Sequence, residues 1–298
     1  MKIAISGSRG FIGSALVKSL RAGGHEVVPM VRASNPVADG VAWSAEAAYV
    51  DTVKLDGIDA VVHLAGESIQ GRWTPKKKAR IRESRYQGTR LLAEALTQPA
   101  KAPRVFVCAS AIGYYGDRGD EVLREESAPG EGFLAEVVRE WEAATEPAAK
   151  KGIRVVNVRS GLVLGRQGGA LAQMLLPFKM GVGGRIGSGK QYMSWIALDD
   201  EVGAIGHALQ SETLRGPVNF VAPNPVRNAE FTKVLGKVLS RPTIFPVPAF
   251  AVKAAFGQMG EELLLYSQRV EPVRLTAAGY KFRYPELEGA LQRALEKS

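Results

Sequence analysis

The first residues of the chain constrain its fold more than any other part. A short apolar run, residues 2–6 (KIAIS), precedes three evenly spaced glycines and a helix-like segment, residues 11–24. Its length and isoleucine content predict that the run is a buried strand. Strand, glycine turn and helix in this order are the context in which a turn binds the pyrophosphate of a dinucleotide. We therefore predict a dinucleotide-binding turn that opens a parallel sheet.

Each glycine of this turn has its own task. Gly7 permits the tight turn, Gly10 lets the backbone approach a pyrophosphate, and Gly13 lets the helix pack close to the strand. The helix that starts at Phe11 and Ile12 offers free N–H groups and the positive end of its dipole to the phosphates. We predict that all five residues contact the cofactor, although the spacing G-x-x-G-x-x-G differs from the more familiar G-x-G-x-x-G.

The rest of the first half alternates between strand-like and helix-like segments. Strands are predicted at 26–31, 58–66, 104–110 and 153–161, and helices at 74–98 and 131–152. Such alternation implies a parallel sheet with helices on both faces and right-handed crossovers. The predicted fold class is α/β, with a Rossmann-type doubly wound sheet over residues 1–160.

Beyond residue 160 glycine and proline become frequent and the segments shorten. Helices are predicted at 227–240, 248–256 and 285–297. We predict a smaller, mostly helical lobe over residues 161–298 that closes over the sheet edge and contacts the substrate. The boundary is approximate, and strands of this part can return to the sheet.

The end of the second predicted strand bears on the choice of cofactor. An NAD site carries Asp or Glu there, to bind the adenosine ribose. This strand ends in Arg32, the first acid after it is Asp39, and Arg9 lies in the glycine turn. Guanidinium groups can bind a 2′-phosphate that an acid would repel. We predict NADP(H) rather than NAD(H); two solvated surface arginines are the alternative.

Charge and cysteine content limit the other classes of function. The net charge is +9, and residues 72–90 carry eight Lys or Arg against one Glu, which accounts for +7. This stretch is typical of one charged face of a surface helix and lacks the exposed aromatics of a nucleic-acid site. The single cysteine, Cys108, fits a reducing cytoplasm, and the three histidines are isolated. We predict a cytoplasmic monomer or homodimer with a small-molecule substrate and without metal, membrane or nucleic-acid partners.

Several motifs together resemble a known superfamily. SGSRGFIG (6–13), VVHLAGE (61–67) and ASAIGYYG (109–116) resemble the extended, epimerase-like branch of the short-chain dehydrogenases/reductases. GSGKQYMSWIALDDE (187–201) and the tail 262–291 resemble an atypical subfamily with a characteristic C-terminal domain of unknown function. The resemblance implies that Leu64, Ala65 and Gly66 line the cofactor and that Ser110 lies near the nicotinamide.

The chain departs from this superfamily in its catalytic motif. The usual chemistry rests on Tyr-x-x-x-Lys, yet none of the eight tyrosines has lysine four residues later. The expected helix places Phe133 or Leu134 at the tyrosine position and Val137 or Val138 at the lysine position. Candidate substitutes are Tyr114 and Tyr115, together with Ser110, and also Glu67; a packing role is the alternative for each.

Arg85 is a further candidate for the cofactor site. It shares a helix face with Ile81, Gly88 and Leu92, so its guanidinium is expected to be partly buried. A buried charge needs a partner. That partner is either a protein carboxylate or an anion such as a cofactor phosphate.

These patterns lead to one functional hypothesis and one alternative. We predict an NADP(H)-binding oxidoreductase or epimerase-like protein of unknown substrate; the alternative is a non-catalytic NADP(H)-binding regulator or scaffold. The segment 184–191 matches the start of a P-loop, but Gln191 replaces the required Ser or Thr and a strand-like segment follows. We therefore do not expect ATP or GTP binding.

Overall fold

A twisted, mainly parallel sheet forms the centre of the molecule. The computed structural model describes residues 1–35 and 37–296, so Lys297, predicted at the end of a helix, lies outside the described residues. Within that part the sheet has eight strands, and only β4 runs antiparallel to its neighbour. Their order is β12 (Gly216–Phe220), β8 (Arg154–Ser160), β6 (Val105–Ala111), β5 (Ala60–His63), β1 (Lys2–Ser6), β2 (Glu26–Arg32), β3 (Val41–Ser44) and β4 (Tyr49–Val50).

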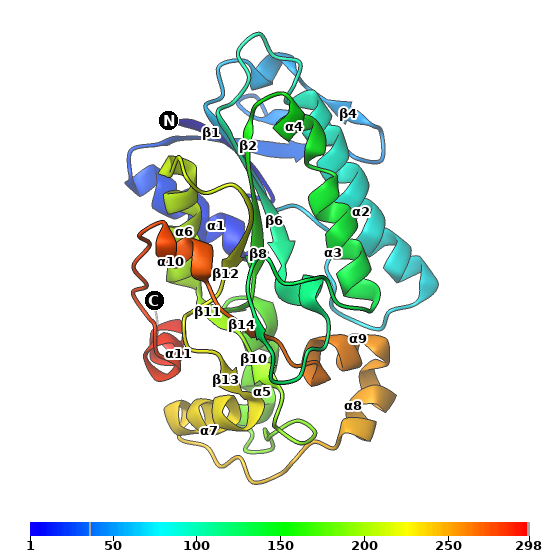
Figure 1. Cartoon of the computed structure of the whole chain (residues 1–298), viewed down its shortest axis with the longest axis vertical. Coiled ribbons are helices and arrows are strands. Elements are labelled where there is room, and N and C mark those ends of the chain that lie inside the picture. The colour runs from blue at the N-terminus through cyan, green and yellow to red at the C-terminus, as the bar shows by residue number, and fades with distance from the viewer. Residues whose placement is uncertain (36, 297–298) are drawn as a thin grey trace.

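Helices cover both faces of this sheet (Figure 1). One apolar core lies under α1 and α6 and includes Leu16 and Ile205; the opposite core lies under α2, α3 and α4 and includes Leu92 and Trp141. The bounds are α1 (Phe11–Ala22), α6 (Leu198–Gln210), α2 (Pro75–Ala95), α3 (Phe133–Ala143) and α4 (Glu146–Lys150). The predicted doubly wound Rossmann-type fold is confirmed.

Most helices of the C-terminal part gather beyond one end of the sheet, whereas the short helix Val273–Ala277 lies beside β12 (Figure 1). Their core is formed by α5, α7 and α11 around Phe231 and Leu235. The bounds are α5 (Gly169–Lys179), α7 (Asn228–Leu239), α8 (Ala249–Phe256), α9 (Gln258–Gly260), the π-helical turn η3 (Glu261–Leu265), α10 (Val273–Ala277) and α11 (Leu287–Leu295). The smaller, mostly helical lobe is thus confirmed.

Short pairs of strands and two 3-10 turns complete the structure. The pairs are β7 (Val122–Leu123) with β14 (Arg269–Val270), β9 (Leu162–Leu164) with β11 (Trp195–Ala197), and β10 (Tyr192–Met193) with β13 (Val226–Arg227); the turns are η1 (Val53–Leu55) and η2 (Ile112–Tyr115). The chain leaves the sheet after β8 and returns to it at β12. Both β12 and α6 follow residue 160, yet they belong to the sheet and to the helices that cover it.

Candidate functional site

The glycine turn has the geometry that its spacing predicts. Gly7 has a φ of +69°, a conformation that favours glycine. A Cβ on Gly13 would lie 2.1 Å from the carbonyl oxygen of Gly7, so the helix approaches the turn after β1 too closely for any side chain at this position. Gly10 is the N-cap of α1. No capping side chain accepts a hydrogen bond from the backbone N–H groups of the first helical turn, and no acidic residue lies in that turn. Free N–H groups therefore point out of this turn, as an anion site requires.

One arginine within this turn, Arg9, and one at the end of β2, Arg32, lie at the same end of the sheet. Parallel pairing places Ser6 opposite Met30, so Arg32 emerges from β2 at the level of the turn. Arg9 and Arg32 are both exposed, and no ion pair joins either of them to an acid in the described residues. Their charges are available to a ligand, and no carboxylate ends β2 to bind the ribose of NAD.

The loop that leads into α5, the first helix of the C-terminal lobe, packs against Phe11 at the start of α1. Cβ atoms placed on Gly165 and Gly168 would lie 2.5 and 2.6 Å from the Phe11 ring, so neither of these two positions has room for a side chain. Phe11 and Ile12 both pack against the core under α1 and α6. Sequence reasoning assigned Phe11 to the cofactor and missed this contact with the lobe.

The loop 64–66 follows β5 and touches the turn. A Cβ on Gly7 would lie 2.9 Å from the backbone nitrogen of Ala65, so Leu64 and Ala65 form one wall beside the turn. The guanidinium of Arg85 lies over Gly66, where a Cβ would be 3.6 Å from its Cζ atom. The predicted loop, turn and arginine are therefore brought together.

Arg85 has no carboxylate partner among the described residues. Its Nη1 donates to the carbonyl oxygens of Glu67 (3.0 Å) and Ile81 (3.2 Å), and its Cζ lies 4.9 Å from the centre of the Trp141 ring. Burial lowers the pKa of Arg85 to about 10, and the nearby Glu67 opposes that shift. Arg85 remains charged at neutral pH, and carbonyl groups and an aromatic face surround the charge without neutralising it.

Glu67 is held in an ion pair. Its Oε1 accepts from Lys77 Nζ at 2.6 Å, and Arg80 lies 3.7 Å away. The hydrogen bond from Lys77 lowers the pKa of Glu67, and burial only partly offsets this effect. Glu67 is therefore ionised at neutral pH and a poor proton donor. This ion pair also neutralises part of the positive charge of α2.

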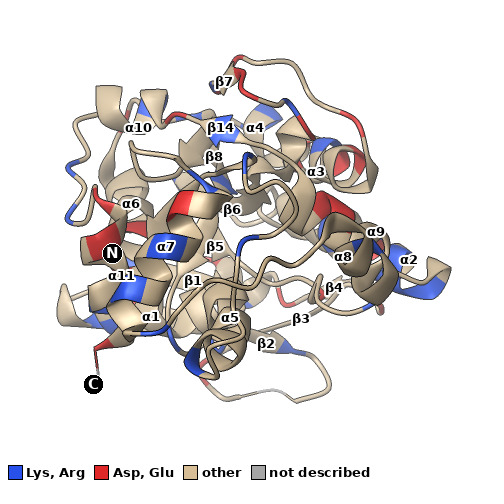
Figure 2. Ribbon diagram, turned by 90° about the horizontal axis from the view of Figure 1, so that it is seen from below, with Lys and Arg blue, Asp and Glu red and all other residues tan. Residues whose placement is uncertain are grey.

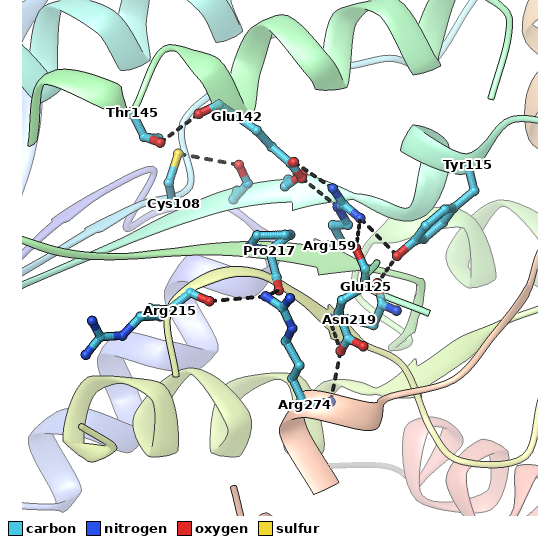
Figure 3. Close-up of polar contacts among 12 residues, drawn as sticks. Cys108, Tyr115, Glu125, Glu142, Thr145, Arg159, Arg215, Pro217, Asn219 and Arg274 are labelled. Carbon is cyan, nitrogen blue, oxygen red and sulfur yellow. Dashed lines mark hydrogen bonds and ion pairs between the residues drawn. The ribbon is translucent and has the colours of Figure 1, made fainter. Parts of the chain in front are cut away.

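Ser110, near the end of β6, belongs to a buried polar network, of which Figure 3 shows Glu142, Arg159 and Tyr115. Its hydroxyl donates to Glu142 Oε1 at 2.7 Å. Glu142 also accepts from Arg159 Nε at 2.7 Å and from Arg159 Nη2 at 2.8 Å. Burial opposes the charge on Arg159, but the bidentate pair with Glu142 outweighs it, and the pKa of Arg159 is raised.

The two candidate tyrosines both contact Arg159 of this network. The Tyr115 hydroxyl donates to Asn219 Oδ1 at 2.7 Å and accepts from Arg159 Nη1 at 3.0 Å, and the side chain is fully buried. Burial raises the pKa of Tyr115 to about 12, while the charge of Arg159 opposes the shift. Tyr114 is partly buried, and the guanidinium of Arg159 stacks 3.5 Å from its ring centre. In this arrangement Tyr115 has no free hydroxyl group for a substrate.

The helix expected to carry the missing catalytic pair is α3. Phe133, Val137 and Val138 are buried in it and provide only apolar contacts. Glu142 follows Val138 by one helical turn and supplies the polar group on that face. Sequence reasoning missed Glu142 and Arg159. The signal for both was Arg159 itself, an arginine near the end of the predicted buried strand 153–161, because a buried charge needs a carboxylate.

The P-loop-like segment 184–191 and the basic stretch 72–90 also have defined places in the structure. The segment 184–191 leads into β10 rather than a helix, as expected. In α2, Arg82 pairs with Glu136 and Glu140 of α3. Figure 2 shows Lys and Arg interspersed with Asp and Glu over most elements in that view. No described helix is long and apolar enough to span a membrane, and the described residues contain no His, Cys, Asp and Glu cluster that could hold a metal.

Comparison with known proteins agrees with this architecture. Residues 3–221 match the model of the NAD dependent epimerase/dehydratase family, and residues 247–294 match a domain of unknown function, DUF1731. An epimerase family protein of Mycobacterium tuberculosis is 44% identical, covering 97% of this chain and 96% of the relative. The human epimerase family protein SDR39U1 is 40% identical, covering 98% and 99%.

Solved structures extend the comparison to three dimensions. The crystal structure of human SDR39U1 (isoform 2) with NADPH has a TM-score of 0.91 at 39% identity, covering 98% of each chain. A Thermus thermophilus UDP-glucose 4-epimerase complex with NAD has a TM-score of 0.75, covering 98% of this chain and 97% of that one; at 19% identity it supports the fold alone.

The fold and the turn define a dinucleotide-binding protein of the epimerase type. The chain belongs to the NAD dependent epimerase/dehydratase family, and its C-terminal part carries the additional domain of unknown function. The resemblance seen in the sequence is therefore confirmed.

Proposed function

We propose that this protein binds NADP(H) at the glycine turn and is an oxidoreductase or epimerase-like enzyme of unknown substrate. The observation that carries the proposal is the pair of exposed arginines, Arg9 within a turn with unsatisfied N–H groups and Arg32 at the end of β2. The pyrophosphate would lie on the N-terminus of α1, and the 2′-phosphate would lie between the two guanidinium groups. The NADPH bound to the human relative supports this cofactor.

The other walls of the site follow from the same arrangement. Leu64, Ala65 and Gly66 would contact the cofactor from the β5 side, and Arg85 would offer its uncompensated charge to a phosphate or an anionic substrate. Bound NADP(H) supplies hydride chemistry. The lobe formed by the residues after 160 would provide the substrate side, since the loop that leads into its first helix packs against Phe11.

Ser110 is the polar group best placed for substrate contact at the end of β6. Because its hydroxyl donates to Glu142, its lone pairs can accept a hydrogen bond from a substrate hydroxyl. Ser110, held by Glu142, would accept a hydrogen bond from the substrate hydroxyl that the usual tyrosine contacts. Tyr114 and Tyr115 would support Arg159 rather than meet the substrate.

Turnover assays test this proposal. NADPH is incubated with aldehydes, ketones and sugar nucleotides, and turnover of at least one substrate is expected, with a loss of at least about tenfold in Ser110→Ala. Ser127→Ala is the matched control and should retain activity, because Ser127 is a half-buried loop serine whose hydroxyl accepts from the Arg124 N–H at 3.0 Å and not from the site. Failure of the protein to bind NADPH would contradict the proposal.

A second candidate function is non-catalytic NADP(H) binding by a regulator or scaffold. Two observations favour it: a buried valine, Val137 or Val138, stands where the lysine belongs, and the Tyr115 hydroxyl is already bonded to Asn219 and Arg159. Micromolar NADPH affinity without turnover of any compound in the panel is the result that would support this alternative over an enzyme.

A further inference from the structure

A buried pair of polar side chains lies directly behind two loops of the candidate site. Ser6 ends β1 and His63 ends β5, and parallel pairing places them side by side. Both side chains are fully buried. Their polar atoms, Ser6 Oγ and His63 Nδ1, lie 2.6 Å apart. Neither side chain contributes to the site described above, so their contact needs its own explanation.

The partners of the serine determine where its proton goes. Ser6 Oγ accepts from the backbone N–H groups of Leu64, at 3.1 Å, and Ala65, at 3.3 Å. These two donors occupy both lone pairs of the hydroxyl, so its own proton is directed to His63 Nδ1. His63 is then the tautomer with its ring proton on Nε2.

The surroundings of the ring agree with a neutral histidine. His63 Nε2 has no hydrogen-bond partner in the described part of the chain. The rings of Trp43 and Phe106 enclose the imidazole, with centroids 5.5 and 6.4 Å away. Burial lowers the pKa of His63 to about 4. A neutral ring is required here, because a charged imidazolium has two donors and no acceptor.

We propose that Ser6 and His63 are positioning residues that set the separation between the glycine turn and the loop 64–66. Ser6 is bonded to the loop through Ala65 and immediately precedes Gly7, whose backbone is already in contact with the same loop. His63 orients the hydroxyl so that its lone pairs face the loop. Without this acceptor the Ala65 N–H would be buried and unpaired, and the loop would shift to find another partner.

The inference rests on the proposed NADP(H) binding, because the two loops are the two walls of that site. Fluorescence titration of the full-length protein with NADPH tests it. Ser6→Ala and His63→Leu should weaken NADPH binding about tenfold, the effect of one lost hydrogen bond that leaves a buried partner unsatisfied. His63→Asn, whose side-chain oxygen can replace Nδ1 as the acceptor, should stay within about threefold of wild type.

Val61→Ala is the matched control. Val61 lies on the same strand and the same face as His63, is fully buried, and has no polar side-chain atom. Its truncation should lower thermal stability without changing NADPH affinity. Equal weakening by Val61→Ala and His63→Leu would overturn the proposal, since the loss would then follow general core damage. Unchanged affinity in both Ser6→Ala and His63→Leu would overturn it as well.

Nuclear magnetic resonance of the wild-type protein keeps the proposal testable if the variants do not fold. The chain has only three histidines, so ¹⁵N labelling of histidine gives few signals. A protonated Nε2 and an unprotonated Nδ1 at His63 are expected at neutral pH, and the opposite tautomer would contradict the proposal. If wild-type protein fails to bind NADPH at all, the proposed function is wrong, while this tautomer remains a separate result.

Discussion

Arg159 illustrates at the residue scale how a buried charge determines the roles of its neighbours. Glu142 neutralises it, Tyr114 stacks on it and Tyr115 bonds to it. We expect Tyr115→Phe to lower the free energy of unfolding by about 1–3 kcal/mol, because Arg159 and Asn219 each lose a partner in a buried place. Urea denaturation measures this, and NADPH affinity should stay unchanged.

Tyr114→Phe is the control for this variant. The variant keeps the aromatic ring that contacts Arg159. The Tyr114 hydroxyl makes no hydrogen bond within the described residues, so the stability of Tyr114→Phe should match that of wild type. If Tyr115→Phe instead kept full stability and lost turnover, Tyr115 would be the proton-exchanging residue after all.

Glu201 gives stability a dependence on pH. It is buried on α6, its Oε1 accepts from Ser160 Oγ at 2.6 Å, and its Oε2 is unpaired in the described structure. Burial raises its pKa to about 7, with the Ser160 hydrogen bond opposing the shift. Between about pH 4.5 and 7 the folded protein therefore holds a proton that the unfolded chain has lost, so stability falls as pH rises through this window.

The variant Glu201→Gln removes this titration. It should be more stable than wild type at pH 8, by up to about 3 kcal/mol, and the advantage should shrink at pH 5. Chemical denaturation of both proteins at the two pH values measures the difference. An equal difference at pH 5 and pH 8 would show that Glu201 does not titrate in this range.

At the scale of elements, a side chain of the C-terminal lobe caps a helix of the sheet layer. The buried Glu262 carboxylate of η3 accepts from the backbone N–H groups of Phe133, at 3.0 Å, and Leu134, at 2.9 Å, at the start of α3. Glu262→Gln should cost about 1–2 kcal/mol of stability, typical of a lost cap, and should speed amide exchange in the first turn of α3. Differential hydrogen exchange measures this.

The adjacent Glu261 provides the comparison. It forms a largely exposed ion pair with Lys253, and Glu261→Gln should leave stability within about 0.5 kcal/mol of wild type. Equal effects of the two variants would mean that capping of α3 does not join the lobe to the sheet.

The elements divide into those that local patterns predict and those that depend on distant partners. The strands β1, β2, β5, β6 and β8 and the long helix α2, with Thr74 as its cap and Pro75 at its start, follow from local patterns. β3 and β4 were not predicted, because they have four and two residues and no long apolar run. The predicted helix 131–152 is divided at residues 144–145 into α3 and α4.

The candidate site shows the same division. Gly7, Gly10 and Gly13 could be found from their spacing, since each satisfies a local steric demand. Pairings such as Ser110 with Glu142, or Ser6 with His63, join residues more than thirty positions apart, and no local pattern specifies them. They follow only from the register of the parallel strands and the packing of α3.

At the scale of the whole molecule, the sheet layer depends on residues that follow the first lobe helix. β12 forms its edge, and α6 covers the face that includes Val158 and Phe220. A chain that ends at residue 160 should therefore lack cooperative thermal unfolding, because one apolar face is left uncovered. Calorimetry of residues 1–160 measures this, and a sharp unfolding transition would show that the first part is an independent domain.

The central claim is that Arg9 and Arg32 select NADP(H) at the glycine turn. The most direct test is the ratio of the dissociation constants for NADPH and NADH, measured for wild-type protein and for Arg32→Asp. We predict that wild type prefers NADPH by at least about tenfold, the effect of one charge-assisted hydrogen bond, and that Arg32→Asp abolishes the preference. Equal affinities in wild type, or an unchanged ratio in Arg32→Asp, would contradict the account.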